Sequence, residues 1–68
     1  MQALKRYLAA NHVREAEFAR RVGVSRYAVN KWVRGERRPS LERAALIERA
    51  TEGAVPWTSW IRRNRRAA

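Results

Sequence analysis

The sequence predicts an all-α protein of four to five short helices in one compact domain. Three observations support this prediction. Apolar residues recur at spacings of three and four along most of the chain. Glycine, serine and asparagine stand at the ends of these periodic segments. The segment EAEFARRVGVSRYAVNKWVR (residues 15–34) has the pattern of two helices packed across a tight corner. We expect the domain to cover residues 1–61. Residues 62–68 are basic, have no large apolar side chain and are expected to be disordered when free.

The first two helices are separated by a short connection. The first is expected over residues 2–10, where three apolar residues share one face, with Asn11 as a left-handed stop. Val13 then packs at the entry to a second helix, which runs from residue 14 to residue 21 or 22.

Serines mark the starts of the next two helices. Ser25 precedes the third helix, and its hydroxyl can accept an amide proton from the first turn. That helix ends at residue 33 or 34, before Gly35. Ser40 caps the fourth helix, which runs from residue 41 to residue 51 or 52 and acts as a scaffold.

The apolar run of residues 55–61 has two interpretations. It can form a short fifth helix, with Pro56 at its first position and with Trp57, Trp60 and Ile61 on one face. It can also form a β-strand, because periodicity alone does not assign a run of this length. We favour the helix.

The corner between the second and third helices centres on Gly23. Two helices that cross steeply need a small residue at the crossing, which Ala19 supplies, and a corner residue able to adopt a positive φ, which glycine does at little cost. The apolar residues around the corner form one wedge: Phe18, Val22, Val24, Val29 and Trp32. The pattern predicts a helix-turn-helix. A helical hairpin that binds no nucleic acid is the alternative.

Residues 15–34 resemble the helix-turn-helix of the Cro and phage-repressor class. The resemblance continues through VRGERRPSLERA, and LIERATEGAV is similar to the short Cro-like prophage regulators of the YdaS type, so that about four fifths of the chain is covered. It implies a lambda-repressor-like fold. It also implies a transcription regulator, a Cro-like repressor, that reads an operator in double-stranded DNA through its third helix in the major groove.

The charge of the chain agrees with a polyanionic partner. Fourteen arginines and two lysines stand against six glutamates, which gives a net charge of +10. Such a chain concentrates on polyanions, and the planar guanidinium suits phosphate and guanine. Basic tails also serve solubility, and basic amphipathic helices bind membranes. Membrane binding is disfavoured here because the apolar residues of these helices are expected to be buried in the core.

Several classes of protein are disfavoured. Without cysteine, and with His12 as the single histidine, the chain offers neither disulfides nor a metal site, and we expect no cofactor and no small-molecule ligand. We also expect no enzymatic activity, because the short chain cannot wall off a pocket. No apolar run could span a membrane and no secretory signal is apparent, so a cytoplasmic, nucleoid-associated protein is expected.

The outer face of the third helix supplies the candidate base contacts. Arg26 can donate to O6 and N7 of guanine, and Asn30 can pair with adenine or with a neighbouring side chain. Lys31 can reach guanine or a phosphate, and Tyr27 a thymine methyl group or a phosphate. In the resembled class these positions contact bases. A solvated polar face is the alternative.

Flanking residues are candidates for contact with the phosphate backbone. They are Glu15, Arg20, Arg21, Ser25, Arg34, Arg37 and Arg38. Glu15 departs from the resembled class, which has glutamine there, and a carboxylate repels phosphate unless it is paired. Arg14 and Arg26 are the candidate partners of that carboxylate.

The last predicted helix supplies candidates for an interface. We expect a homodimer on a palindromic operator, because one small domain reads only about four to six base pairs. Its candidate residues are Trp57, Trp60 and Ile61, with at least one tryptophan in the core. The YdaS-type resemblance leaves a second function open, namely an antitoxin-type module that neutralises a protein partner through the same residues, with DNA binding secondary.

Overall fold

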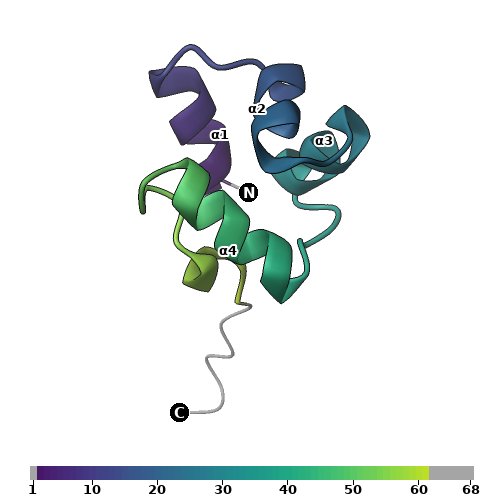
Figure 1. Cartoon of the computed structure of the whole chain (residues 1–68), viewed down its shortest axis with the longest axis vertical. Helices are drawn as coiled ribbons and strands as arrows, with labels where there is room; N and C mark the ends of the chain where they lie inside the picture. The colour runs from purple at the N-terminus through teal and green to yellow at the C-terminus, as the bar shows by residue number, and fades with distance from the viewer. Residues whose placement is uncertain (1, 62–68) are drawn as a thin grey trace.

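Four α-helices and one turn of 3-10 helix form the part of the chain that the computed structural model describes, residues 2–61 (Figure 1). They are α1 (Gln2–Ala10), α2 (Glu15–Val22), α3 (Arg26–Arg34), α4 (Leu41–Ala50) and η1 (Trp57–Trp60). No strand occurs between residues 2 and 61, which confirms the all-α prediction. The predicted basic tail, residues 62–68, lies outside the described residues.

Serine hydroxyls cap two of the helices, as the sequence predicts. The Ser25 hydroxyl accepts from the amide of Ala28 at 3.1 Å, and the Ser40 hydroxyl accepts from the amide of Arg43 at 3.2 Å. Each bond satisfies an amide that the first helical turn leaves without a partner. Helix α2 begins one residue later than predicted and has no side-chain cap, but Glu15 in its first turn complements the helix dipole.

The end of α1 differs from the prediction. The left-handed residue is His12, with φ +52°, and not Asn11. The amide of Asn11 instead continues the helical pattern and donates to the carbonyl of Tyr7 at 3.0 Å, and its Nδ2 donates to the same oxygen at 2.9 Å. Because Asn11 is held by both bonds in the last turn, the chain reverses one residue later.

The corner between α2 and α3 forms as the sequence predicts. Gly23 ends α2 with φ +83°, and its amide donates to the carbonyl of Ala19 at 2.8 Å. Ala19 is buried where the two helices meet. The larger wedge residues are buried, except that Val24 is partly buried and packs against them: Phe18, Val22, Val29 and Trp32. The two helices are thereby fixed relative to each other.

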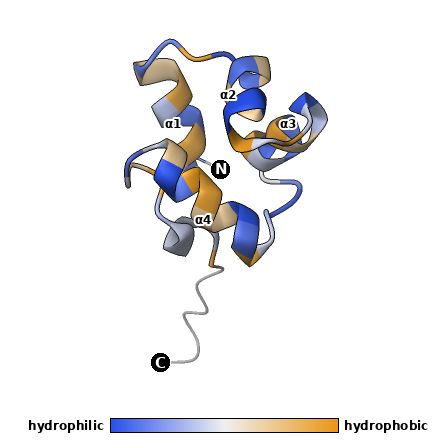
Figure 2. Ribbon diagram, in the orientation of Figure 1, coloured by the Kyte–Doolittle hydropathy of each residue, from blue (hydrophilic) through white to orange (hydrophobic). Residues whose placement is uncertain are grey.

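Apolar segments of all four α-helices meet in the middle of the molecule, and hydrophilic segments face outward (Figure 2). Helix α1 contributes Leu4 and Leu8 to this core, and α4 contributes Ala44 and Ile47. The core thus reaches helices on both sides of the corner and holds the α2–α3 unit in place.

Residues 55–61 form a shorter helix than predicted. Pro56 is extended, with ψ 155°, and precedes η1 rather than occupying its first position. Val55 is fully buried, and its amide donates to the hydroxyl of Thr51 at 3.0 Å, so the chain must enter the core before it can turn. Helical geometry therefore begins only at Trp57, and Ile61 is already extended.

The far end of η1 completes the core. Trp60 is buried and meets Trp32 edge-on, with ring centroids 6.3 Å apart. One tryptophan of the last segment is therefore part of the core, as expected. None of the helices among residues 2–61 is long and apolar enough to cross a membrane, and this part of the chain has no cluster of residues that could hold a metal ion.

Candidate nucleic-acid interface

Helix α3 has one face in the core and the other in solvent. Val29 and Trp32 are buried, which fixes the rotation of the helix about its axis. Arg26 and Tyr27 are exposed on the opposite side, Tyr27 to 64%. Asn30 lies one turn beyond Arg26 and is half-buried. The structure thus brings predicted base-contacting side chains together on a single polar face.

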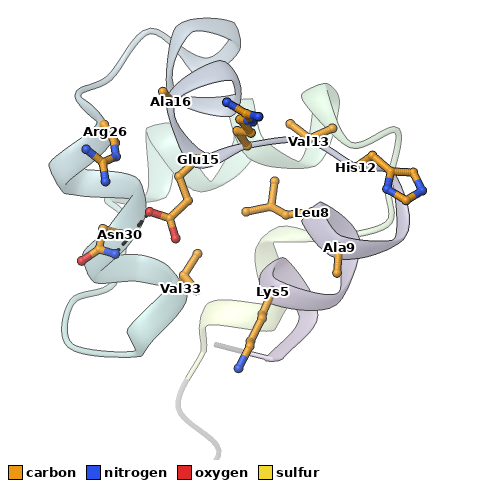
Figure 3. A pocket seen from close by; sticks show the side chains of 11 residues that line it. Lys5, Leu8, Ala9, His12, Val13, Glu15, Ala16, Arg26, Asn30 and Val33 are labelled. Carbon is orange, nitrogen blue, oxygen red and sulfur yellow. Dashed lines mark hydrogen bonds between the residues drawn. The ribbon is translucent and has the colours of Figure 1, made fainter.

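A hydrogen bond between Glu15 and Asn30 joins the start of α2 to the middle of α3. The Nδ2 of Asn30 donates to the Glu15 carboxylate at 3.2 Å. Figure 3 shows that carboxylate turned toward Asn30, and both side chains line a hollow between α1, α2 and α3. The sequence offered Arg14 or Arg26 as the partner, and that expectation is wrong. Among residues 2–61, neither arginine makes an ion pair, and the partner of Glu15 is an amide.

Basic side chains gather beside the first turn of α3. A cleft between that turn and the linker into α4 is lined by basic side chains and by serine and tyrosine hydroxyls: Ser25, Tyr27, Lys31, Arg37, Arg38, Ser40 and Arg43. The Nη1 of Arg38 also donates to the carbonyl of Trp60 at 3.5 Å. Arg43 is absent from the predicted contacts, because α4 is expected to act only as a scaffold and its spacing does not show which residues reach this cleft.

The remaining predicted phosphate contacts lie at the ends of α2 and α3. Arg20 and Arg21 are exposed in the last turn of α2, and Arg21 pairs with Glu17 at 2.9 Å. Arg34 is exposed in the last turn of α3. Cations there also complement the partial negative charge of each helix end.

Comparison of the sequence with known proteins gives two results that agree with this geometry. The sequence profile of the helix-turn-helix family matches residues 4–57, from α1 into η1. The chain belongs to the Cro/C1-type helix-turn-helix family. Helix-turn-helix regulators of this type bind double-stranded DNA and regulate transcription.

A curated relative of this helix-turn-helix chain is the Escherichia coli (strain K12) protein named "Putative transcriptional regulator YdaS". The two are 46% identical over 41 residues, which is 60% of this chain and 42% of YdaS. The chain therefore matches less than half the length of that protein. No solved structure matches this chain significantly.

Glu36 is an acidic residue of the candidate interface that was not among the predicted contacts. Glu36 accepts from the Nζ of Lys31 at 2.7 Å and pairs with the Nε of Arg34 at 3.0 Å. The hydrogen bond from Lys31 and the charge of Arg34 hold the pKa of Glu36 below its ordinary value, and the same bond raises the pKa of Lys31. The Lys31 ammonium also lies 5.1 Å from the centroid of the Tyr27 ring. Two predicted DNA contacts are thus already held by one carboxylate.

An apolar patch lies away from α3, beside the start of α4. We call Leu41, Trp57 and Ile61 the apolar patch; they are 73%, 43% and 55% exposed and line one shallow groove with Arg38. Trp60 also lines this groove but is only 7% exposed. Of the predicted dimer residues, two are therefore available at the surface, and Leu41, which was expected to serve the scaffold, lies beside them.

Proposed function

We propose that this chain is a sequence-specific repressor of the Cro type that places α3 in the major groove of an operator. The observation that carries the proposal is the polar outer face of α3 on a helix-turn-helix scaffold, with basic side chains at both ends of the helix. A major groove admits one helix and shows a distinct pattern of donors and acceptors for each base pair.

Arg26 is the principal base reader in this proposal. It is exposed in the first turn of α3, and among residues 2–61 it has no ion-pair partner, so its guanidinium is free to donate to O6 and N7 of guanine. Asn30 reads a second base. Tyr27 and Lys31 lie on the same side and contact a base or the neighbouring backbone.

The flanking cations fix the domain on the backbone. They are the phosphate contacts Arg20, Arg21, Arg34, Arg37 and Arg38, with Ser25 beside them, and we add Arg43 because it lines the same cleft. Glu15 does not contact phosphate through its carboxylate, which is occupied by Asn30. Phosphate contacts set position and affinity but carry no sequence information.

A second copy of the chain completes the operator complex. We propose residues 1–61 as the binding domain and the basic residues 62–68 as its tail, with the apolar patch as the dimer surface. Its exposed tryptophan supports this assignment, since aromatic side chains anchor interfaces. A symmetric pair would read two half-sites about one helical turn apart. Occupancy of the operator would then block transcription.

Matched arginine substitutions test the proposal. Arg26→Ala should weaken binding to a selected operator about tenfold and relax the preference at one base pair. Arg49→Ala removes the same charge from the exposed last turn of α4, away from α3, and should leave the preference intact. Equal effects of the two substitutions on every base position would refute reading by α3. A protein-neutralising module would then become the better account of the apolar patch.

A further inference from the structure

The hydrogen bond between Glu15 and Asn30 limits what Asn30 can present to a base. We infer that Glu15 determines specificity through Asn30, by holding its amide so that the base read there is one with an amino group in the major groove, adenine or cytosine. The inference rests on the proposed function, because it requires α3 in the groove. It assigns to Glu15 a positioning role in place of a phosphate contact.

An asparagine amide is ambiguous on its own. Its oxygen accepts and its nitrogen donates, and the two ends have nearly the same shape. One orientation suits the amino groups of adenine and cytosine, and the flipped orientation suits the carbonyl groups of guanine and thymine. An unrestrained Asn30 would therefore discriminate poorly between amino and keto bases.

The Glu15 carboxylate removes this ambiguity. An ionised carboxylate only accepts hydrogen bonds, so the end of the amide that faces it must be Nδ2, which lies 3.2 Å away. Flipping the amide would set Oδ1 against the carboxylate and lose the bond. Both side chains are half-buried, so water competes less for the bond than it would at an open surface.

The held amide lies where a base would meet it. Asn30 shares a small hollow on the outer side of α3 with Arg26 and Tyr27, and it follows Arg26 by one helical turn. Its Oδ1 stays available to accept from N6 of adenine or N4 of cytosine. The second hydrogen of Nδ2 remains free for N7 of adenine, so adenine gains two bonds and cytosine one.

Two glutamates on α2 provide a matched test. Glu15→Gln replaces the carboxylate with an amide that can bond either orientation of Asn30, so the flip becomes allowed. Glu17→Gln makes the same charge change two residues away, where the carboxylate pairs with Arg21 of its own helix. Each full-length variant is used to select binding sites from a random double-stranded DNA pool, and the base frequencies are compared with those of the wild type.

The expected result is specific to one base position. The wild type and Glu17→Gln should favour adenine or cytosine there by about tenfold over guanine and thymine, and Glu15→Gln should reduce this ratio to about threefold or less. The preference attributed to Arg26 should persist in all three. Glu15→Asp, which keeps the charge but shortens the reach, should lose the same preference and covers the case in which Glu15→Gln does not fold.

Two results would overturn the inference. One is a Glu15→Gln or Glu15→Asp profile that matches that of Glu17→Gln at every position. The other is a Glu15→Gln effect that is as large in an Asn30→Ala background as in the wild type, because Glu15 would then act without Asn30. A wild type that selects no sequence at all contradicts the proposed function instead, so the two failures are distinguishable.

Discussion

At the scale of single residues, the interface contains its own competitor for DNA. Glu36 holds the Lys31 ammonium and the Arg34 guanidinium at hydrogen-bond distance in the free protein. Both cations are among the proposed DNA contacts. A phosphate that uses them must displace a carboxylate that is already there, so we expect Glu36 to lower the affinity of the chain for DNA.

Removing this carboxylate should strengthen binding. Glu36→Gln should raise affinity for DNA of any sequence severalfold and steepen the plot of log affinity against log salt by about one unit for each freed cation that contacts a phosphate. Glu52→Gln makes the same charge change beyond the end of α4, where the side chain is exposed. Fluorescence anisotropy at several salt concentrations measures both. Identical slopes for the two variants would show that Glu36 does not compete.

The same network has a defined pH dependence. Because the folded-state pKa of Glu36 lies below its ordinary value of 4.5, the ion pairs are fully present above that value and are lost only as the pH falls through the lowered pKa. An NMR titration of the Glu36 carboxyl should therefore show a midpoint below 4.5, and Lys31→Met should move the midpoint upward. A midpoint that Lys31→Met leaves unchanged would contradict the assigned cause.

At the scale of elements, one buried hydroxyl joins α4 to the last segment of the chain. The Oγ1 of Thr51 donates to the carbonyl of Ile47 at 2.9 Å and accepts from the amide of Val55 at 3.0 Å. Thr51 is a buried polar residue of the core, and its bond with the Val55 amide directs Val55 inward. It thereby places η1 against α4, with Trp60 in contact with Trp32 of α3.

Substitutions at position 51 measure this link. Thr51→Val keeps the shape but leaves the buried Val55 amide without a partner, which should lower the free energy of unfolding by roughly 1–3 kcal/mol. Thr51→Ser keeps the hydroxyl and should cost less. Urea unfolding followed by tryptophan fluorescence compares the variants. A Thr51→Val protein as stable as Thr51→Ser would mean that the hydroxyl does not hold the segment.

Local signals were sufficient to predict most of the elements. The serine caps and the corner glycine act within one helical turn, so their positions could be read from neighbouring residues. The neighbouring residues do not show whether Asn11 or His12 is the left-handed residue, since both tolerate that conformation. The pairing of Glu15 with Asn30 spans fifteen residues and two helices, so it depends on the crossing geometry that only the folded chain defines.

At the scale of the whole molecule, charge and apolar surface have opposite effects on self-association. Two copies with a net charge of +10 repel each other in solution, whereas the apolar patch favours their contact. DNA lowers the repulsion by supplying phosphates to both copies. We therefore expect dimers to form mainly on DNA.

The sequence could not predict that Leu41 belongs to the apolar patch. Helical spacing does not show which face of α4 its first residue occupies.

Two exposed leucines on α4 test the dimer surface. Leu41→Ser removes part of the apolar patch, whereas Leu46→Ser changes an exposed leucine that does not line the groove. Leu41→Ser should lower cooperative binding to a palindromic operator about tenfold while binding to an isolated half-site is retained. Sedimentation of the DNA complexes reports the stoichiometry. Cooperative binding that survives Leu41→Ser and Trp57→Ala alike would place the dimer surface elsewhere.

The claim that α3 reads DNA sequence is tested most directly by selecting binding sites from random double-stranded DNA at two salt concentrations. Phosphate contacts weaken steeply with salt, whereas discrimination between bases depends on contacts in the groove. We expect enrichment of a palindromic sequence that persists at the higher salt, with a guanine preference that Arg26→Ala removes. Binding that is uniform over sequence and disappears at the higher salt would contradict it, because the charge of the chain would then be acting alone.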